Sequence, residues 1–584
     1  RVDAQVDERT LREIYLPAFE RVVTQADPWT VMSSYNRVNG TYAAESHWLL
    51  TEVLREEWGF AGLVVSDWGG VARRAVGVAA GLDLEMPASL GNGARKVHAA
   101  LADGSLTEAD VDRAATRVLT LVARALAGQQ IPVAPVDVDA HHALAREAAT
   151  ASAVLLKNEG GLLPLAAHGG PVAVIGEFAR TPRYQGAGSS QVNPTRVDAA
   201  LDALREGLAG RREVLFAPGF VVEHDAADPA LVAEAVAAAA AADDVVLFLG
   251  LPPSHESEGY DRTHLDLPAH QVDLLRAVAA VNPRVVVVLS NGSVVEVSTW
   301  VDVVPALLEG WLLGQAGGAA TADLLLGRAE PTGRLAETIP VRLEHNPSHG
   351  AFPGEDGHVR YGEGLLIGYR WYDTHHLPVA FPFGHGLGYT TFAYGEPVAR
   401  VREGEPTVDV SVAVTNTGER PGTETVQVYV AQPGATVHRP EQELRAFARV
   451  HLEPGRTEVV HLTLERRAFA TWRTGAHRWA VEGGVHEVRV GASSRDLRGT
   501  VSITLEGEPV VAPLAADSTV DAWFAHPQAG PWLREALGDG DFAALLADPQ
   551  NGQMMRAIPV QRLSRFPGFP VREEQVDDAV RRFG

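Results

Sequence analysis

Apolar residues in the first part of the chain recur either at helical spacing or in short runs of strand length. These patterns predict helices over Leu11–Val22, Ser46–Trp58, Gly70–Ala80, Gly93–Leu101 and Thr107–Leu126, and strands over Thr30–Tyr35 and Gly62–Ser66. Alternation of strands with helices is typical of parallel β/α architecture. Only two or three strands are visible before Val133, which is too few to close a barrel.

The next region, residues 134–341, carries clearer strands. Short apolar or β-branched runs alternate there with alanine-rich stretches, at Val172–Ile175, Glu213–Ala217, Val245–Leu249, Val285–Leu289 and Ala306–Trp311. Nearly continuous apolar strands are typical of a parallel sheet covered by helices on both faces. We therefore expect an α/β sandwich domain, with Ala235–Ala242 in a crossover helix rather than in a linker.

The hydrophobic period changes to two in the last third of the chain. A connection rich in glycine, proline and histidine over residues 342–399 leads to valines that alternate with polar residues between Val408 and Val414 and again from Val426 to Val430. This alternation predicts an antiparallel β-sandwich of the fibronectin type III kind over residues 400–507. Residues 508–584 carry tryptophans and leucines at helical spacing and predict a helical tail packed on another domain.

Composition narrows the classes of partner. A chain of 584 residues is long enough for three or four domains, and its formal charge of −24 disfavours nucleic acid and anionic membrane as partners. The absence of cysteine excludes disulfides, a thiolate nucleophile and cysteine-bound metal. No apolar run is long enough to cross a bilayer, so no membrane partner is expected. The cytoplasm is slightly favoured over secretion, and a homo-oligomer is left open.

Asp67 is the first candidate for chemistry, because it follows directly on the apolar strand that ends at Ser66. Side chains at the carboxyl ends of barrel strands project into the active site. A carboxylate beside an aromatic residue, here Trp68, suits sugar chemistry, since the carboxylate attacks the anomeric carbon and the indole packs on the apolar sugar face. The alternative is an aspartate that caps a helix beginning near Gly70.

Four segments occur in order around Asp67: VMSSYNRVNG at 31–40, LREEWGFAG at 54–62, SDW at 66–68 and AGLDLEMP at 80–87. This series resembles glycoside hydrolase family 3, in particular its multidomain β-glucosidases. The resemblance implies that residues 1–133 are the C-terminal part of the family's (β/α) barrel. It also implies that Asp67 is the catalytic nucleophile and that Trp68 and Tyr35 contact the sugar.

A second carboxylate is expected in the loop after the strand Val245–Leu249. This loop holds Glu256 and Glu258 within the segment SHESEGYDR at 254–262. Retaining glycosidases need an acid about 5 Å from the nucleophile, and loops at the carboxyl ends of parallel strands are where such sheets bind ligands. The resemblance implies that Glu258 is this acid/base, with Glu256 as the alternative. A solvated acidic loop would explain the cluster without any function.

Other motifs have structural interpretations. Gly186–Ser190 lacks the lysine and the spacing of a phosphate-binding loop, and the resemblance places it beside the active-site cleft. His385 is expected to be a hydrogen-bonded structural histidine. The histidine pairs at 141–142 and 375–376 lack the spacing of a zinc helix, so neither a metal nor another cofactor is expected.

The sequence therefore predicts a retaining, exo-acting β-glucosidase that binds a small β-glycoside or oligosaccharide. A β-xylosidase of the same family is the nearest alternative, a β-N-acetylglucosaminidase is less favoured, and a non-catalytic carbohydrate-binding scaffold is a different class. Members of the family carry an Asp-Gly segment, arginines and a Lys-His pair that hold the innermost sugar, and these are not found here. We therefore expect the chain, which looks cut from something longer, to be inactive or poorly folded by itself.

Overall fold

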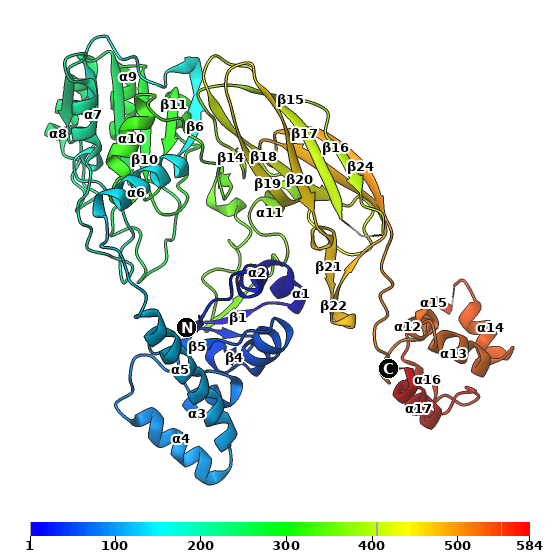
Figure 1. Ribbon diagram of the computed structural model, residues 1–584. Coiled ribbons are helices and arrows are strands. Elements are labelled where there is room, and N and C mark those ends of the chain that lie inside the picture. Colours follow the sequence, from blue (N-terminus) through cyan, green and yellow to red (C-terminus); the bar gives the residue numbers. More distant parts are fainter. Residues whose placement is uncertain (1, 405–406, 551, 584) are drawn as a thin grey trace. The chain divides into compact units, whose positions relative to one another are not determined.

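The computed structural model describes residues 2–404, 407–550 and 552–583 (Figure 1). The chain divides into two compact units. The first comprises Arg1–Glu465 and Val485–Ile503, and the second comprises Arg466–Gly484 and Thr504–Gly584. Each unit is described separately below.

The first region of unit 1 is built around two parallel strands. β2 (Thr30–Ser33) pairs with β5 (Leu63–Ser66), and Val65 forms a further parallel bridge to Leu84. Asp83, which is almost fully buried, fixes β5 by accepting the backbone N–H of Val64 at 2.8 Å. The same carboxylate forms ion pairs with two arginines, Arg55 at 2.8 Å and Arg117 at 2.9 Å. The predicted strand–helix alternation is confirmed.

The helices of this region differ from the expected ones at their ends. The expected helix over Leu11–Val22 is two segments, a π-helical turn η1 (Leu11–Tyr15) and α2 (Pro17–Ala26), because Pro17 has no N–H with which to continue the ladder. The second expected helix is η3 (Trp48–Glu57), again with π-type turns. The remaining helices are α3 (Arg74–Ala80), α4 (Asn92–Asp103) and α5 (Glu108–Gly128).

A small sheet at the start of the chain was not expected. β1 (Asp3–Gln5) pairs in parallel with β3 (Arg37–Val38) and with β13 (His358–Arg360), and β3 pairs with β4 (Thr41–Tyr42). Strands of two or three residues are too short to show a hydrophobic period. Through β13, the glycine-rich connection therefore pairs with the first strand of the chain before the sandwich begins.

The α/β domain contains the largest core. Its strands are β6 (Val154–Asn158), β7 (Val172–Ile175), β8 (Val214–Ala217), β9 (Asp244–Gly250), β10 (Val285–Ser290) and β11 (Ala306–Glu309), in the spatial order β6-β11-β10-β9-β7-β8. All pair in parallel except the edge strand β6. The helices are α6 (Val138–Ser152), α7 (Ala200–Leu208), α8 (Pro229–Ala240), α9 (Ala269–Val281) and α10 (Gly317–Leu325).

Two groups of helices cover the sheet of this domain (Figure 1). α10 packs with α6 and α7, and α8 packs with α9. The strand β9 is buried along its whole length, as a strand covered on both faces must be. The alanine-rich tract lies in α8, where Ala235 and Ala239 are fully buried, so the predicted crossover helix is confirmed.

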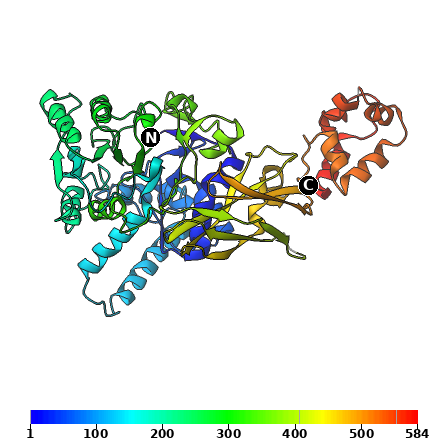
Figure 2. The same cartoon turned by 90° about the horizontal axis from the view of Figure 1, so that it is seen from above.

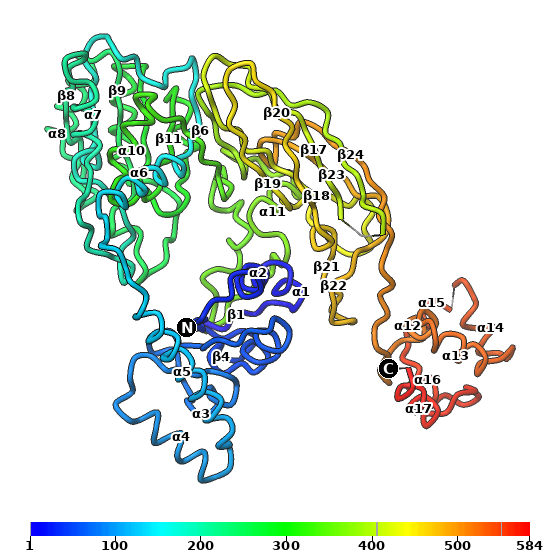
Figure 3. Tube along the Cα trace, in the orientation of Figure 1, coloured from blue at the N-terminus to red at the C-terminus, as the bar shows by residue number. Residues whose placement is uncertain are grey.

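The last part of unit 1 is an antiparallel sandwich, traced in Figure 3. One sheet has the order β15-β17-β16 with β20 also on β17, and the other has the order β19-β18-β23-β24. The strands are β15 (Phe392–Tyr394), β16 (Val398–Val401), β17 (Val408–Asn416), β18 (Gly422–Ala431), β19 (Glu443–Leu452), β20 (Thr457–Leu464), β23 (Gly484–Gly491) and β24 (Leu497–Leu505). Burial alternates along β17, so its predicted period of two is confirmed.

Connecting elements precede this sandwich. They are β12 (Ile339–Pro340), α11 (Tyr369–Thr374) and β14 (Val379–Phe381). His385 donates from its Nε2 to the backbone carbonyl oxygen of Leu156 at 2.9 Å. This contact agrees with the structural role expected for His385.

Unit 2 contains a two-stranded ribbon and the helical tail. The ribbon is β21 (Ala470–Arg473) with β22 (Arg478–Val481). The tail consists of α12 (Val520–Ala525), α13 (Ala529–Leu537), α14 (Asp541–Ala547), α15 (Gly552–Arg556), α16 (Val560–Leu563) and α17 (Glu573–Phe583), the orange and red helices of Figure 2. They bury Trp523, Leu533 and Val576 in a core of their own, and the expected packing of the tail on another domain stays a prediction. None of the described helices is long and apolar enough to span a membrane.

Candidate active site

The order of strands in the α/β domain identifies one edge of its sheet as a place for a ligand. The chain runs from β7 to β8 on one side, and then from β9 to β10 and β11 on the other side. Ligands bind outside the carboxyl ends of parallel strands where the direction of winding reverses, here between β7 and β9. A Cβ atom at Gly176, which follows β7 with φ +106°, would lie 2.2 Å from the carbonyl oxygen of Phe248, so glycine is needed for this close approach.

Asp67 and Tyr35 follow neighbouring parallel strands. Ser33 and Ser66 are opposite each other in the last register position of β2 and β5, so the chain leaves both strands at the same edge. Asp67 comes directly after β5, and its backbone N–H donates to the carbonyl oxygen of Ser33 at 3.2 Å. Tyr35 follows two residues after β2 and is half-buried. Both predicted site residues therefore lie where a barrel holds its active site.

The side chain of Asp67 does not cap a helix. Its Oδ1 accepts the N–H of the next residue, Trp68, at 2.6 Å, while α3 begins only at Arg74. Trp68 is 57% exposed, so its indole is not used in the core and presents an apolar surface beside Asp67. The alternative interpretation of Asp67 as a helix cap is therefore not what the structure contains.

Glu258 lies against the loop that follows β7. Its Oε2 accepts the N–H of Ser189 at 2.6 Å and the hydroxyl of Ser189 at 2.5 Å. A Cβ atom at Gly188, where φ is +92°, would lie 2.7 Å from the Cβ of Glu258. The segment Gly186–Ser190 therefore binds this carboxylate. The close approach of Glu258 to Gly188 explains why the segment contains glycine.

Two opposing influences act on the ionisation of Glu258. The hydrogen bonds from Ser189 lower the pKa of its carboxyl group below the ordinary value, and the negative charge of Asp67 acts in the opposite direction. Asp67 and Glu258 belong to different domains of unit 1, yet they are close enough to interact electrostatically. The structure thus places the two carboxylates within range of an electrostatic interaction, and that both act at one site stays a prediction.

Glu256, the alternative to Glu258, is held by other groups. Its Oε2 accepts the N–H of Gly292 at 2.8 Å and lies 3.1 Å from a guanidinium nitrogen of Arg183. Its Oε1 accepts the hydroxyl of Ser293 at 2.8 Å. Both oxygens of Glu256 are therefore occupied within the α/β domain, whereas the side chain of Glu258 is exposed.

A further acid, Glu309, lies at the end of β11 beside the loop that follows β10, and it was not expected from the sequence. It is 1% exposed, and it accepts the N–H of Trp311 at 2.9 Å and Asn291 Nδ2 at 3.3 Å. Burial raises the pKa of Glu309 to about 8, with the charges of Glu337 and Glu256 adding to the effect and the two hydrogen bonds opposing it.

This buried acid makes the stability of the domain depend on pH. Glu309 stays protonated in the folded protein up to about pH 8 but ionises near its ordinary value of 4.5 when unfolded. Its contribution to stability is therefore fully present below that ordinary value and is lost as the pH rises towards 8. We expect Glu309→Gln to gain a few degrees in Tm over the parent protein between about pH 5 and pH 8.

Thermal unfolding across this pH range, followed by circular dichroism, would measure the difference. Glu234→Gln, on the exposed face of α8, is the matched control and should follow the parent curve. Parallel curves for Glu309→Gln and the parent protein would contradict the raised pKa.

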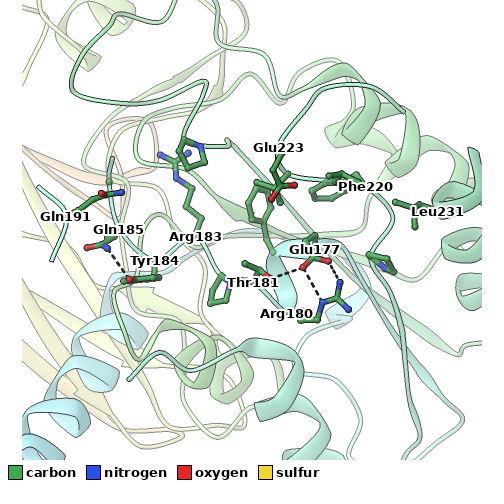
Figure 4. A pocket seen from close by; sticks show the side chains of 17 residues that line it. Glu177, Arg180, Thr181, Arg183, Tyr184, Gln185, Gln191, Phe220, Glu223 and Leu231 are labelled. Atoms are coloured by element: carbon green, nitrogen blue, oxygen red, sulfur yellow. Dashed lines mark hydrogen bonds and ion pairs between the residues drawn. The ribbon is translucent and has the colours of Figure 1, made fainter. Parts of the chain in front are cut away.

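A cavity of about 610 Å³ lies beside the site, between the loops that follow β7 and β8 (Figure 4). Arg183 and Gly186 line it, and they come from the same loop that carries Ser189. Glu177 accepts hydrogen bonds from Arg180 at 2.6 Å and from Thr181 at 2.7 Å on its wall. The loop after β7 thus lines the cavity with Arg183 and Gly186 and binds Glu258 with Ser189.

The sequence did not identify Ser189, Arg183 or Glu309 as partners of the acidic loop. Ser189 carried a signal, since it belongs to the glycine-rich segment that the family resemblance placed beside the cleft. Arg183 and Glu309 carried none, because their contacts are made between loops far apart in sequence. Among the described residues no group of three or more histidine, aspartate or glutamate side chains is arranged to hold a metal ion.

The sequence matches three domain families. It matches the glycosyl hydrolase family 3 N terminal domain over residues 1–121, the glycosyl hydrolase family 3 C-terminal domain over residues 153–389, and a fibronectin type III-like domain over residues 424–494. Asp67 falls in the first match and Glu258 in the second.

Characterised relatives resemble the chain over almost its whole length. It is 47% identical to an exo-α-(1→6)-L-arabinopyranosidase of Bifidobacterium breve over 97% of this chain and 76% of the relative. It is 43% identical to thermostable β-glucosidase B of Acetivibrio thermocellus over 99% of this chain and 77% of the relative. The crystal structure of a family 3 β-glucosidase from Bifidobacterium adolescentis superposes with a TM-score of 0.86 at 47% identity, covering 91% of this chain and 78% of that one.

Proposed function

The chain belongs to glycoside hydrolase family 3, and from this membership we propose that it is a retaining, exo-acting β-glycosidase that removes a terminal non-reducing sugar. The observation that carries the proposal is the position of the two carboxylates, because Asp67 directly follows the parallel strand β5 and Glu258 lies in the loop after the parallel strand β9. The negative charge of Asp67 also acts on Glu258. Two carboxyl groups about 5 Å apart on either side of a glycosidic bond are what a retaining mechanism requires.

In the first step Asp67 acts as the nucleophile. One carboxylate oxygen of Asp67 forms a bond to the anomeric carbon while the bond from that carbon to the leaving oxygen breaks. Glu258 donates its proton to the leaving oxygen, so the aglycone departs as a neutral alcohol. The product of this step is a glycosyl ester of Asp67.

In the second step Glu258 acts as a base. Its carboxylate takes a proton from water as the water oxygen bonds to the anomeric carbon, and the ester bond to Asp67 breaks. Both displacements invert the anomeric carbon, so the product keeps the configuration of the substrate. The hydrogen bonds from Ser189 suit this second step, because they hold Glu258 as a carboxylate.

Trp68 and Tyr35 are proposed to contact the sugar. The exposed indole of Trp68 follows the nucleophile directly, and an aromatic face packs well on the apolar C–H face of a pyranose. Tyr35 leaves the neighbouring strand at the same edge as Asp67, where its hydroxyl can bind a sugar hydroxyl or the carboxylate.

For the substrate we propose a β-D-glucoside first and an α-L-arabinopyranoside second. Among the proteins that resemble this chain, several are named β-glucosidases, and two Bifidobacterium relatives are named exo-α-(1→6)-L-arabinopyranosidases. In both sugars the bond to the leaving group is equatorial, so the same pair of carboxylates serves either one. The sugars differ at C4 and C5, where groups that hydrogen-bond the correct hydroxyl discriminate strongly.

A panel of 4-nitrophenyl glycosides tests this proposal, and turnover by this chain alone would contradict the expectation that it is inactive by itself. We expect the highest kcat/KM on the β-D-glucoside, a lower one on the α-L-arabinopyranoside, and little turnover of the β-D-xyloside and the α-D-glucoside. Proton NMR during turnover should show β-glucose before mutarotation produces the α-anomer. Initial release of α-glucose would rule out the retaining mechanism, and preference for the arabinoside would select the second candidate.

A further inference from the structure

We propose that Glu256, Arg183 and Ser293 form a clamp that positions Glu258, and that Glu256 is a positioning residue with no proton-transfer role of its own. The proposal rests on the proposed function of Glu258 as acid/base. It concerns a group of side chains that lies next to that carboxylate and ties together three loops of the α/β domain.

The clamp begins at Arg183, in the loop after β7. Its side chain is only 4% exposed and forms an ion pair with Glu256 at 3.1 Å. One guanidinium nitrogen also donates to the carbonyl oxygen of Leu251, and the other donates to the backbone carbonyl of Glu256 at 3.1 Å. Arg183 therefore holds the loop after β9 at its first residue and again two residues before Glu258.

The loop after β10 completes the clamp. The carboxylate of Glu256 covers the backbone of Gly292, where a Cβ atom would lie 3.0 Å from its Oε2. The hydroxyl of Ser293 donates to Glu256 Oε1 and accepts from Arg262 at 2.9 Å. Because Arg262 follows Glu258 by four residues, the exposed acid lies between two anchored points of its loop.

A buried asparagine, Asn291, supports the loop that binds Glu256. Asn291 donates to the carbonyl oxygen of Ser293 at 3.0 Å and to Glu309 at 3.3 Å. Asn291 itself is 0% exposed, so the short loop that receives Glu256 cannot shift without breaking buried hydrogen bonds. Within the part of the chain that the structure describes, only Ser189 hydrogen-bonds the carboxylate of Glu258, which leaves this side chain free to reach a substrate.

Buried ion pairs are weak evidence for stability but good devices for position, since losing one partner leaves a charge without compensation. In Glu256→Ala the guanidinium of Arg183 loses its counter-ion and the loop loses its contact with Gly292. A displacement of about 1 Å at a catalytic group is enough to lower a rate about a hundredfold. The expected defect is therefore in kcat for substrates that need the acid, with little change in KM.

The first experiment is hydrogen exchange, which needs no turnover. Glu256→Ala should speed exchange of the amides in residues 251–262 and 186–192 by about tenfold or more, and Glu256→Gln, which keeps an acceptor for Gly292, should show a smaller effect. Glu234→Ala on α8 is the matched control and should leave these segments unchanged. Unchanged exchange in Glu256→Ala would overturn the clamp.

The second experiment separates positioning from catalysis. Glu256→Ala should lower kcat on alkyl glucosides about tenfold to a hundredfold, azide should not restore it, and the change should add less than about twofold in a Glu258→Ala background. Azide rescue of Glu256→Ala with a β-glycosyl azide product would make Glu256 the acid/base itself. A full additional loss in the Glu258→Ala background would show a general defect in folding and overturn the proposal.

The two proposals fail in different ways. If Glu258→Ala has no acid/base phenotype, the proposed function fails whatever Glu256 does. The hydrogen-exchange result still decides then whether the clamp orders the loop.

Discussion

Replacing Asp67 with alanine is expected to lower kcat/KM on aryl β-glucosides by about 10⁴-fold or more, the largest effect of any single change in this site. Without its carboxylate no glycosyl ester can form, and the positive charge that develops at the anomeric carbon loses its nearest anion. Glu258 and its contacts with Ser189 do not touch the Asp67 side chain, so the substrate should still bind.

The identity of the products distinguishes this role from any other. With azide present, Asp67→Ala should form an α-glucosyl azide, because the small anion attacks in place of the missing carboxylate and inverts the anomeric carbon once. In the parent protein a 2-fluoro-glucoside should label only the peptide that contains Asp67. Label on another peptide would falsify the assignment of the nucleophile.

A matched control keeps the test independent of folding. Asp67→Asn retains an acceptor for the N–H of Trp68, which the parent side chain binds at 2.6 Å, and should unfold at the same temperature as the parent protein. It should nevertheless be as inactive as Asp67→Ala, because a carboxamide is a poor nucleophile. Activity close to that of the parent in Asp67→Asn would mean that Asp67 acts only through its hydrogen bond.

Local patterns in the sequence were sufficient for the position of Asp67. The apolar run before Asp67 is β5, and the run before Tyr35 is β2, the strand that pairs with β5 in parallel. Because parallel strands end at the same edge of a sheet, the edge at which Asp67 and Tyr35 lie follows from the direction of the two strands. The main sheet was predictable for the same reason, since strands such as β9 are buried on both faces and show it in their composition.

Contacts between distant segments were not predictable. The residue that hydrogen-bonds the Glu258 carboxylate is Ser189, which lies 69 residues away in the sequence. Likewise, β1 pairs with β13, whose residues lie 355 positions further along the chain. Periodicity reports which face of an element is buried but not which element covers it. The same limit hid Glu309, which has an ordinary position at the end of a strand and an unusual environment.

Glu258 needed the family resemblance as well as the pattern. Its loop offered two glutamates only two residues apart, and nothing in the local pattern decides between them. The structure distinguishes them by their partners, because Glu256 is held by Arg183 and by the loop after β10, while Glu258 is exposed and bonded by Ser189.

Replacing Glu258 with alanine is expected to lower kcat/KM on alkyl glucosides by about 10²- to 10⁴-fold, the range that a general acid supplies. Substrates such as 2,4-dinitrophenyl glucoside should be affected much less in the first step, because their leaving group departs without a proton. The glycosyl ester of Asp67 should then accumulate, since no base activates the water of the second step.

Azide again separates the roles. In Glu258→Ala it should attack the accumulated ester, restore turnover and form a β-glucosyl azide, the anomer opposite to that expected from Asp67→Ala. Quench and peptide mapping should recover the ester on Asp67. An α-glucosyl azide, or equal losses on alkyl and dinitrophenyl glucosides, would be incompatible with Glu258 as acid/base.

The variant Ser189→Ala tests the acid/base role of Glu258 without removing its carboxylate. Its hydroxyl and N–H lower the pKa of Glu258, and Ser189→Ala removes one of these two hydrogen bonds and so should raise that pKa. Because the first step needs protonated Glu258, the alkaline limb of the kcat/KM profile should move to higher pH in Ser189→Ala. The direction is diagnostic, since a base required in its ionised form would instead move the acid limb. An unshifted alkaline limb in Ser189→Ala would mean that Glu258 does not donate the proton that this limb reports.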